Sequence, residues 1–183
     1  MRSSDEALLA PPARPVNSVS ISEVEYGITS LTSSLGFLLH ATYLQLRDLL
    51  RLSSEFGLKP SMFELMRITR ENPGIRQAHA SRILLLQESN TTTLVRELQN
   101  LGLMERAKPG KKKRPGLWLT ALGEARFVEI TKIAQGIERE HTASLPDSEA
   151  DKLRVLLSTI YRDGLSRSLA NDAQKGSTSG GSF

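Results

Sequence analysis

The chain of 183 residues is 39% hydrophobic, which is enough to bury the core of one globular domain. It contains no cysteine, so its composition excludes disulfides, thiolate metal sites, iron–sulfur clusters and thiol-based redox sensing. No apolar run approaches the roughly 20 residues that span a bilayer, and residues 1–18 lack the pattern of a signal peptide, so we expect a cytoplasmic protein that does not bind membranes.

The first half of the chain predicts an arm and three helices. Residues 1–24 are rich in proline and serine and are expected to form a flexible N-terminal arm. Leucines recur at spacings of three and four over residues 29–56, which predicts one long helix. Pro60 suits a first helical position and should begin a second helix that stops at residues 71–74. A third, short helix should cover about residues 75–85.

The middle of the chain changes from a helical pattern to an extended one. A tight turn at residues 86–88 leads into a fourth helix over about residues 89–100, which a glycine then stops. Two short strands follow, at residues 103–106 and 116–119, and a basic loop joins them. The pattern therefore predicts a helix, a turn, a second helix and a hairpin.

The last part of the chain is again helical. Thr120 should cap a fifth helix that ends near residue 141, and a last helix should run over residues 147–165. Residues 170–183 are rich in glycine and serine, so we expect a disordered tail. These elements together predict a mainly α fold with a small sheet of two or three strands.

Residues 102–120 contain the whole positive surplus of the protein. This segment has six basic residues and one acidic residue, a net charge of +5, whereas the complete chain carries +4. The remainder of the chain therefore carries −1, and the basicity is local. A basic hairpin tip suits a phosphate backbone, because each Lys or Arg that displaces a counterion adds salt-sensitive affinity.

The fourth helix opens with five consecutive short polar residues, Ser89-Asn90-Thr91-Thr92-Thr93. These are poor interior helix formers, but they supply hydrogen bonds and methyl groups that suit base edges in the major groove. A helix-turn-helix followed by a basic hairpin is thus typical of a winged DNA-binding domain. The predicted DNA-binding residues are Ser89, Asn90, Thr92, Thr93, Arg96, Arg106, Lys111, Lys112, Lys113 and Arg114.

Other interpretations compete with sequence-specific DNA binding. The basic loop could be an ordinary solvated charge run, and the polar start of the fourth helix an ordinary helix terminus. A nonspecific or architectural DNA-binding protein is the main alternative, and a protein-interaction module is another. We expect no enzyme, no catalytic residue and no cofactor, because paired carboxylates, a phosphate-binding loop and a nucleophile motif are all missing. The three histidines show no ligand spacing, so we expect no metal.

Residues 74–124 resemble the core of the multiple-antibiotic-resistance regulator (MarR) family. The carrying motifs are Leu-Gln-Asn-Leu-Gly-Leu-Met-Glu-Arg at residues 98–106 and Leu-Thr-Ala-Leu-Gly at residues 119–123. The resemblance extends over about residues 28–166 and implies a winged helix-turn-helix with a helical dimerisation layer.

The resemblance also implies a domain organisation. A single domain would span residues 25–169, with a DNA-binding lobe at about 58–120 and dimerisation helices at about 28–56 and 121–166. A homodimer of this kind should bind double-stranded DNA at a pseudo-palindromic operator. Members of the family are commonly repressors that small ligands release, often phenolic or aromatic acids or coenzyme A thioesters.

Two positions depart from the family pattern. The wing usually carries an aspartate before its arginine, whereas here Lys111, Lys112, Lys113 and Arg114 fill the loop. We favour Arg114 as the residue that enters the DNA groove. The turn before the fourth helix lacks the usual glycine and has Leu85-Leu86 instead. This change should alter the angle of the recognition helix or deepen the local packing.

The resemblance places a small-molecule effector between the dimerisation layer and the DNA-binding lobe. Candidate residues are polar or aromatic and lie on the first, second and fifth predicted helices: His40, Tyr43, Arg47, Phe63, Arg67 and Phe127. Apolar walls with a few polar groups are the expected chemistry of such a pocket, and an arginine suits a carboxylate. Each of these residues could instead have only a structural role.

Overall fold

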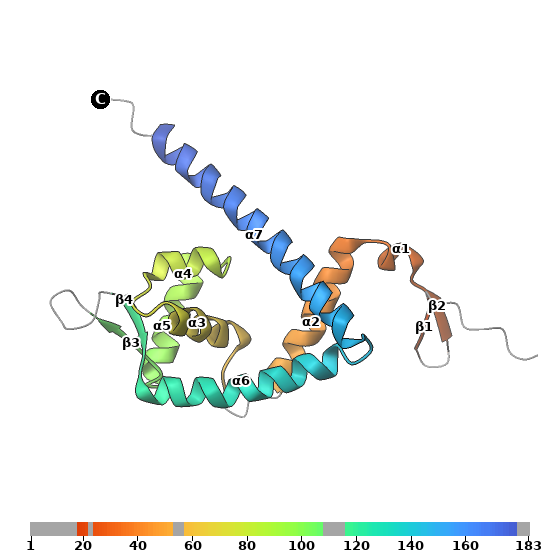
Figure 1. Ribbon diagram of the computed structural model, residues 1–183, viewed down its shortest axis with the longest axis horizontal. Coiled ribbons are helices and arrows are strands. Elements are labelled where there is room, and N and C mark those ends of the chain that lie inside the picture. Colours follow the sequence, from red (N-terminus) through yellow and green to blue (C-terminus); the bar gives the residue numbers. More distant parts are fainter. Residues whose placement is uncertain (1–17, 22–23, 53–56, 108–115, 179–183) are drawn as a thin grey trace, which may run out of the picture. The chain divides into compact units, whose positions relative to one another are not determined.

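The computed structural model describes residues 18–21, 24–52, 57–107 and 116–178. The chain separates into two compact units, residues 1–45 (the N-terminal unit) and residues 46–183 (the C-terminal unit). Figure 1 labels their helices and strands. None of the described helices combines the length and apolar character that spanning a bilayer requires.

The N-terminal unit begins with a strand pair. β1 (Ser18–Ile21) pairs antiparallel with β2 (Val24–Gly27), so that Ser18 lies opposite Gly27. A flexible arm was expected over residues 1–24, and within it residues 18–21 are extended instead. Their sequence alternates serine with a β-branched residue, which is the pattern of a strand.

The long helix predicted over residues 29–56 is two helices. α1 (Thr29–Thr32) ends at Ser33, and α2 (Leu35–Leu52) begins two residues later. The Ser34 hydroxyl accepts a hydrogen bond from the Phe37 amide at 3.3 Å and thereby caps α2. The leucine spacing continues through this break, so periodicity alone predicted one helix. Residues 53–56, at the predicted end, lie outside the described residues.

The C-terminal unit contains the predicted helix-turn-helix and hairpin. Its complete elements are α3 (Pro60–Glu71), α4 (Gln77–Ile83), α5 (Glu88–Asn100), β3 (Met104–Ala107), β4 (Gly116–Leu119), α6 (Ala121–His141) and α7 (Asp147–Thr178). The mainly α fold with a small wing is therefore confirmed. β3 and β4 pair antiparallel, and an isolated bridge between Ile75 and Leu117 adds a third extended segment.

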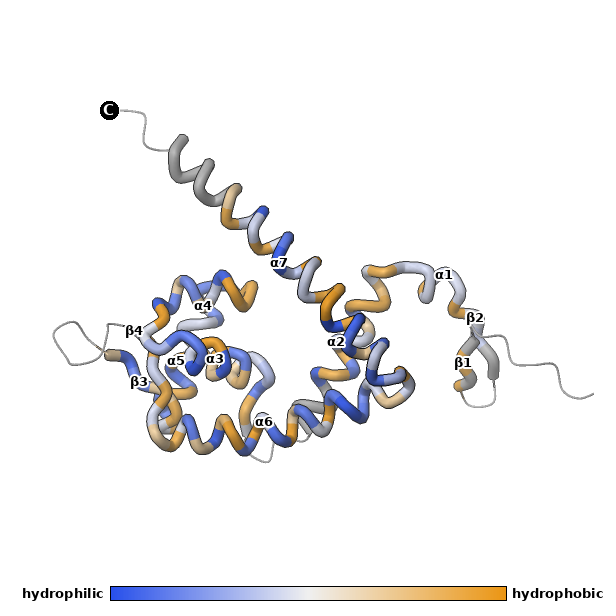
Figure 2. Tube along the Cα trace, in the orientation of Figure 1, coloured by the Kyte–Doolittle hydropathy of each residue, from blue (hydrophilic) through white to orange (hydrophobic). Residues whose placement is uncertain are grey.

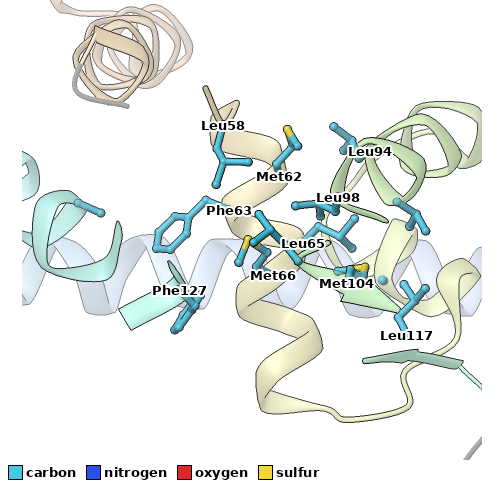
Figure 3. Packing of buried hydrophobic residues seen from close by; sticks show 14 residues of the cluster. Leu58, Met62, Phe63, Leu65, Met66, Leu94, Leu98, Met104, Leu117 and Phe127 are labelled. Atoms are coloured by element: carbon cyan, nitrogen blue, oxygen red, sulfur yellow. The ribbon is translucent and has the colours of Figure 1, made fainter. Parts of the chain in front are cut away.

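Helix α3 forms the centre of the hydrophobic core (Figure 3). It contributes Met62, Phe63, Leu65 and Met66, all at most 4% exposed, and residues at this spacing lie on one broad face of the helix. Buried partners come from α5, the wing strands and α6, and they include Leu94, Val95, Leu98, Met104, Leu117 and Phe127. This packing fixes the recognition helix and the wing on one body.

Four residues join the wing to α6, and we call them the wing–α6 joint: Gly102, Leu103, Thr120 and Gly123. Thr120 caps α6, because its hydroxyl accepts a hydrogen bond from the Gly123 amide at 3.0 Å and donates one to the Gly102 carbonyl at 2.6 Å. The Thr120 amide donates to the Leu103 carbonyl at 3.1 Å. The cap predicted from the sequence is confirmed, and the joint brings the leucine-glycine-leucine and leucine-threonine motifs into contact.

Helix α7 is longer than expected. A disordered tail was predicted over residues 170–183, yet α7 continues to Thr178. Alanine, glutamine and lysine follow Leu169 and sustain a helix until the glycines accumulate. Hydrophobic and hydrophilic residues alternate along α7 (Figure 2). Its large apolar side chains are exposed, among them Val155 at 63% and Ile160 at 52%.

Candidate nucleic-acid interface

Helix α5 presents a polar face to solvent through its first turns. Gln87 is its N-cap residue, so the helix begins at Glu88, one residue earlier than predicted. Of the five short polar residues at its start, four are exposed and Thr91 is fully buried. The four exposed residues, Ser89, Asn90, Thr92 and Thr93, are all predicted DNA-binding residues, and the predicted Arg96, further along the helix, is exposed as well.

The threonine hydroxyls on this face donate hydrogen bonds to backbone carbonyls of the same helix. Thr92 Oγ1 donates to the Glu88 carbonyl at 2.8 Å, and Thr93 Oγ1 donates to the Ser89 carbonyl at 3.2 Å. Each hydroxyl has one proton to donate. In this state both side chains therefore offer acceptor lone pairs and methyl groups to a ligand rather than a donor.

Leu85 adopts a left-handed conformation in the turn between α4 and α5. Its φ is +54°, and its side chain is 68% exposed. The Leu86 amide donates to the Ser81 carbonyl at 2.8 Å and closes the turn. Leucine thus occupies a backbone position that favours glycine. The expected deepening of local packing does not occur at Leu85, because this side chain points to solvent.

A chain of hydrogen bonds joins the wing to the recognition helix. The Arg106 guanidinium, on β3, donates to Gln77 Oε1 at the start of α4. Gln77 Nε2 donates to Thr92 Oγ1 on α5 at 2.7 Å. We call Arg106, Gln77 and Thr92 the interface relay. Two of its members, Arg106 and Thr92, were predicted as DNA-binding residues, and Gln77 was not.

A cleft of about 280 Å³ lies at the base of the wing beside this relay. Its lining residues are Arg76, Gln77, Arg106, Ala107, Gly116 and Leu117. Glu105, the one acidic residue of the wing segment, precedes Arg106 on β3 and therefore projects from the other face of the strand. The cleft thus combines two guanidinium groups with an amide and has no acidic lining residue.

The tip of the wing lies outside the described residues. Four predicted DNA-binding residues belong to it: Lys111, Lys112, Lys113 and Arg114. Their assignment remains a prediction that rests on the local positive charge. Ser89, Asn90, Thr92, Thr93, Arg96 and Arg106 all belong to the C-terminal unit and are exposed.

Comparison with known proteins finds similar chains. No family model matches the chain. A candidate transcriptional regulatory protein for the hcr operon of Thauera aromatica is 26% identical over 152 residues, which are 81% of this chain and 90% of that protein. The MarR-family protein Rv2887 of Mycobacterium tuberculosis, solved in complex with DNA, superimposes with a TM-score of 0.59 at 23% identity, over 69% of this chain and 97% of that chain.

A third match is CouR of Rhodococcus jostii RHA1, solved with p-coumaroyl-CoA. Its TM-score is 0.64 at 19% identity, and the match covers 72% of this chain and 94% of that chain. Rv2887 has also been solved with salicylic acid. The chain has the MarR fold.

The MarR fold brings three of the six predicted effector residues together. The Phe63 and Phe127 rings stack with centroids 5.3 Å apart, and the Arg67 guanidinium lies 4.9 Å from the Phe63 ring centroid. Arg70 extends this stack, because its guanidinium lies 5.0 Å from the Phe127 centroid and binds Glu124 at 2.8 Å. Both rings are buried, so in this state they fill the core rather than line an open pocket.

The other predicted effector residues lie elsewhere in the chain. His40 and Tyr43 are exposed residues of the N-terminal unit, and Arg47 is a half-buried residue of the C-terminal unit. None of the six lines the cleft at the wing base, nor a second cleft of about 340 Å³ lined by Gly57, Lys59, Met62, Glu97, Asn100 and Leu101. Their role in effector binding therefore stays a prediction.

Glu64 is the acidic neighbour of this aromatic stack. Its carboxylate lies 3.7 Å from the Arg67 guanidinium. Partial burial raises the pKa of Glu64, Arg67 opposes that rise, and the nearby Glu138 and Glu71 add to it. Arg67 thus faces a carboxylate that holds its proton more tightly than a free glutamate does.

Metal ligands do not cluster in the part of the chain that the structure describes, since no three His, Asp or Glu residues there lie together in a way that could hold an ion. Arg76 and Gln77 line the cleft at the wing base and are not among the residues predicted from the sequence. A weak signal was available, because an arginine and a glutamine directly begin the helix that precedes the recognition helix.

Proposed function

We propose that this protein is a transcription regulator that binds double-stranded DNA sequence-specifically, as a homodimer, and represses genes until a small ligand releases it. The observation that carries the proposal is the exposed polar face of α5 beside the basic wing. Asn90, Thr93 and Arg96 lie on the first turns of a helix whose opposite side is anchored in the core. Such a helix fits the major groove with its N-terminal residues toward base edges.

The composition of this face favours sequence-specific binding over an architectural role. Ser89, Asn90, Thr92 and Thr93 carry hydrogen-bonding groups and methyl groups but no charge. Charge at the recognition helix would serve phosphates, which carry no sequence information, whereas amide and hydroxyl groups discriminate bases. In this proposal the wing supplies the charge and α5 supplies the discrimination.

A homodimer would cover apolar surface that the single chain leaves exposed. On α7, the exposed apolar residues are Leu153, Val155, Leu156, Ile160 and Tyr161. In the N-terminal unit, Leu35 and Tyr43 on α2 are 63% and 59% exposed. Large exposed apolar faces mark interaction surfaces, and most soluble oligomers are symmetric pairs. A second copy of this chain is therefore the proposed partner.

The effector is proposed to be an aromatic acid, a phenolic compound or an acyl-CoA thioester. Support comes from the compounds solved with Rv2887 and CouR, which are salicylic acid and p-coumaroyl-CoA. In this chain the Phe63 and Phe127 rings lie beside Arg67 and Arg70, so aromatic surface and cationic groups are adjacent. A carboxylate ligand would replace Glu64 as the partner of Arg67.

Fluorescence anisotropy with the purified protein tests this proposal. The labelled DNA is the upstream region of its own gene, the control is the same DNA scrambled, and both are measured near physiological salt. We expect a preference of about 10³ or more for the specific site. Equal and strongly salt-dependent binding to both, also after selection from random sequences, would favour the architectural alternative. The same assay screens aromatic acids and thioesters for release.

Base contacts by α5 are tested with Asn90→Ala and Thr93→Ala. We expect each change to reduce discrimination between specific and scrambled DNA more than it reduces nonspecific affinity. Gln99→Ala, an exposed change near the far end of the same helix, is the matched control and should leave discrimination unchanged. Equal losses on every DNA would exclude base contacts by these two residues.

A further inference from the structure

The interface relay has a defined direction of hydrogen bonding. An arginine only donates, so the oxygen of the Gln77 amide must face Arg106 and its nitrogen must face Thr92. Thr92 Oγ1 accepts a hydrogen bond from Gln77 Nε2 and donates one to the Glu88 carbonyl at 2.8 Å. Two contacts thus fix the hydroxyl of Thr92, and the position of its methyl group follows from the geometry at Cβ.

The wall of the adjacent cleft is held by backbone contacts. The Gly74 amide donates to the Leu117 carbonyl at 2.8 Å, and the Leu117 amide donates to the Ile75 carbonyl at 2.9 Å. Gly116 has φ of +145°, and a Cβ there would lie 2.2 Å from the Gly74 oxygen. The wing base and the segment before α4 therefore touch without room for a side chain, and the cleft is formed before any ligand arrives.

The charges at this cleft suit an anion. Arg76 and Arg106 line it. Neither of these arginines belongs to the ion pairs that the described part of the chain shows. A guanidinium has five N–H donors, so Arg106 can bind Gln77 and a phosphate oxygen at the same time. Arginine also binds phosphate in a bidentate manner.

We propose that this cleft binds one phosphodiester of the DNA backbone between Arg76 and Arg106, and that Gln77 positions Arg106 for the phosphate and Thr92 for the bases. The inference rests on the proposed function. Gln77 would then link the phosphate contact of Arg106, which carries no sequence information, to the base contact of Thr92, which does. Displacing Gln77 would release both the Arg106 guanidinium and the Thr92 hydroxyl.

Replacing single backbone phosphates by neutral methylphosphonates tests the phosphate contact. On the selected operator, wild-type protein should lose roughly tenfold in affinity at one phosphate in each half-site, as expected for a charged hydrogen bond. Arg106→Ala and Arg76→Ala should each show a clearly smaller loss at that same phosphate, because only one of its two cationic partners remains, and ordinary losses at the others. If both variants lose affinity at every phosphate as wild type does, the cleft does not bind the backbone.

The positioning role is tested with Gln77→Ala and the double variant Gln77→Ala/Arg106→Ala. Gln77→Ala should weaken both the phosphate effect and discrimination at the base pairs that Thr92→Val affects, and the double variant should lose less than the sum of the single losses. Gln87→Ala, an exposed glutamine whose side chain makes no cap bond, is the matched control. Additive losses would overturn the positioning role. Melting curves unchanged from wild type establish that each variant is folded.

The outcomes separate this inference from the proposed function. Specific binding without a phosphate that couples to Arg106 refutes the inference alone. Binding that lacks specificity, or no binding, refutes the proposed function and the inference with it. Coenzyme A serves as a second phosphate probe: if Arg106→Ala abolishes its binding and no backbone phosphate couples, the cleft belongs to a thioester effector and the assignment to DNA is wrong.

Discussion

Leu85 places backbone strain directly before the recognition helix. The left-handed conformation costs an L-residue about 1–2 kcal/mol, whereas glycine adopts it freely. Because the side chain is 68% exposed, removing it forfeits little packing. We expect Leu85→Gly to raise the free energy of unfolding by about 1 kcal/mol, net of the greater chain entropy of glycine. Denaturant unfolding monitored by circular dichroism measures this change.

Leu101→Gly is the matched control for that change. Leu101 is also an exposed leucine at a helix end, but its φ of −79° is ordinary for any residue. Glycine there should lower stability, since it adds chain entropy without relieving strain. A loss of stability in both variants would contradict strain at Leu85.

Gly123 permits the closest approach within the wing–α6 joint. A Cβ at this position would lie 2.0 Å from the Leu103 carbonyl oxygen, which is backbone and cannot rotate away. Gly123→Ala should therefore destabilise the protein by about 2 kcal/mol or more. The melting temperature, measured by calorimetry, should fall accordingly.

Gly136→Ala is the control for Gly123→Ala, because both glycines lie on α6. Nothing lies within 4 Å of a Cβ built at Gly136. Alanine there should stabilise the helix by about 0.5–1 kcal/mol. Opposite signs at the two glycines are the expected result, and stabilisation at both would show that helix propensity, rather than the approach to Leu103, decides.

The sequence correctly predicted residues whose interactions involve near neighbours along the chain. The Thr120 cap depends on an amide three residues away, so its signal is contained in a few letters. Gln77 contacts residues 15 and 29 positions distant, and no short pattern announces such a pairing. Leu85 was noticed as a departure from glycine, but its exposed orientation depends on packing that the sequence does not reveal.

At the scale of elements, boundaries followed their local signals. Helix α3 runs from Pro60 to Glu71 as predicted, because proline begins it and an Asn-Pro-Gly sequence ends it. The break between α1 and α2 was missed, although Ser34 is a favourable N-cap residue, because the leucine spacing on both sides suggested continuity. Strands β1 and β2 were missed because β1 and the start of β2 fall in the proline- and serine-rich segment that was expected to form a flexible arm.

The wing is the element whose charge should dominate the salt dependence of DNA binding. Arg114→Ala should weaken binding to specific and scrambled DNA alike, and should reduce the slope of log affinity against log salt by about 1. Lys132→Ala, an exposed change on α6, is the control and should leave both quantities unchanged. Wild-type affinity and slope in Arg114→Ala would exclude a phosphate or groove contact by that residue.

At the scale of the molecule, removal of α7 should dissociate the proposed dimer into monomers. Among the described residues, α7 exposes a series of large apolar side chains, and Tyr161 donates a hydrogen bond to the Ile83 carbonyl at 2.6 Å. A chain that stops at Leu145 should therefore be monomeric by light scattering, while a chain lacking only residues 179–183 should remain dimeric. A stable dimer of the shorter chain would contradict the proposed dimerisation surface.

The resemblance of residues 74–124 to a known family predicted the architecture of the C-terminal unit correctly, because helix-turn-helix and wing are encoded by compact motifs. The division of the chain near residue 45 was not predicted. It falls within α2 (Leu35–Leu52), where the leucine spacing is uninterrupted, and periodicity carries no information about which side chains find a partner.

The wing–α6 joint leaves no hinge at which the wing could swivel on its own. Thr120 forms hydrogen bonds with both Gly102 and Leu103, and the backbone at Gly123 lies so close to the Leu103 carbonyl that a Cβ would not fit. In the proposed dimer, the separation of the two wings would then be set by the helices behind them. One base pair inserted between the half-sites rotates them by about 35° relative to each other. A stiff joint cannot follow that rotation, so operators with altered half-site spacing should be rejected even when every contacted base is retained.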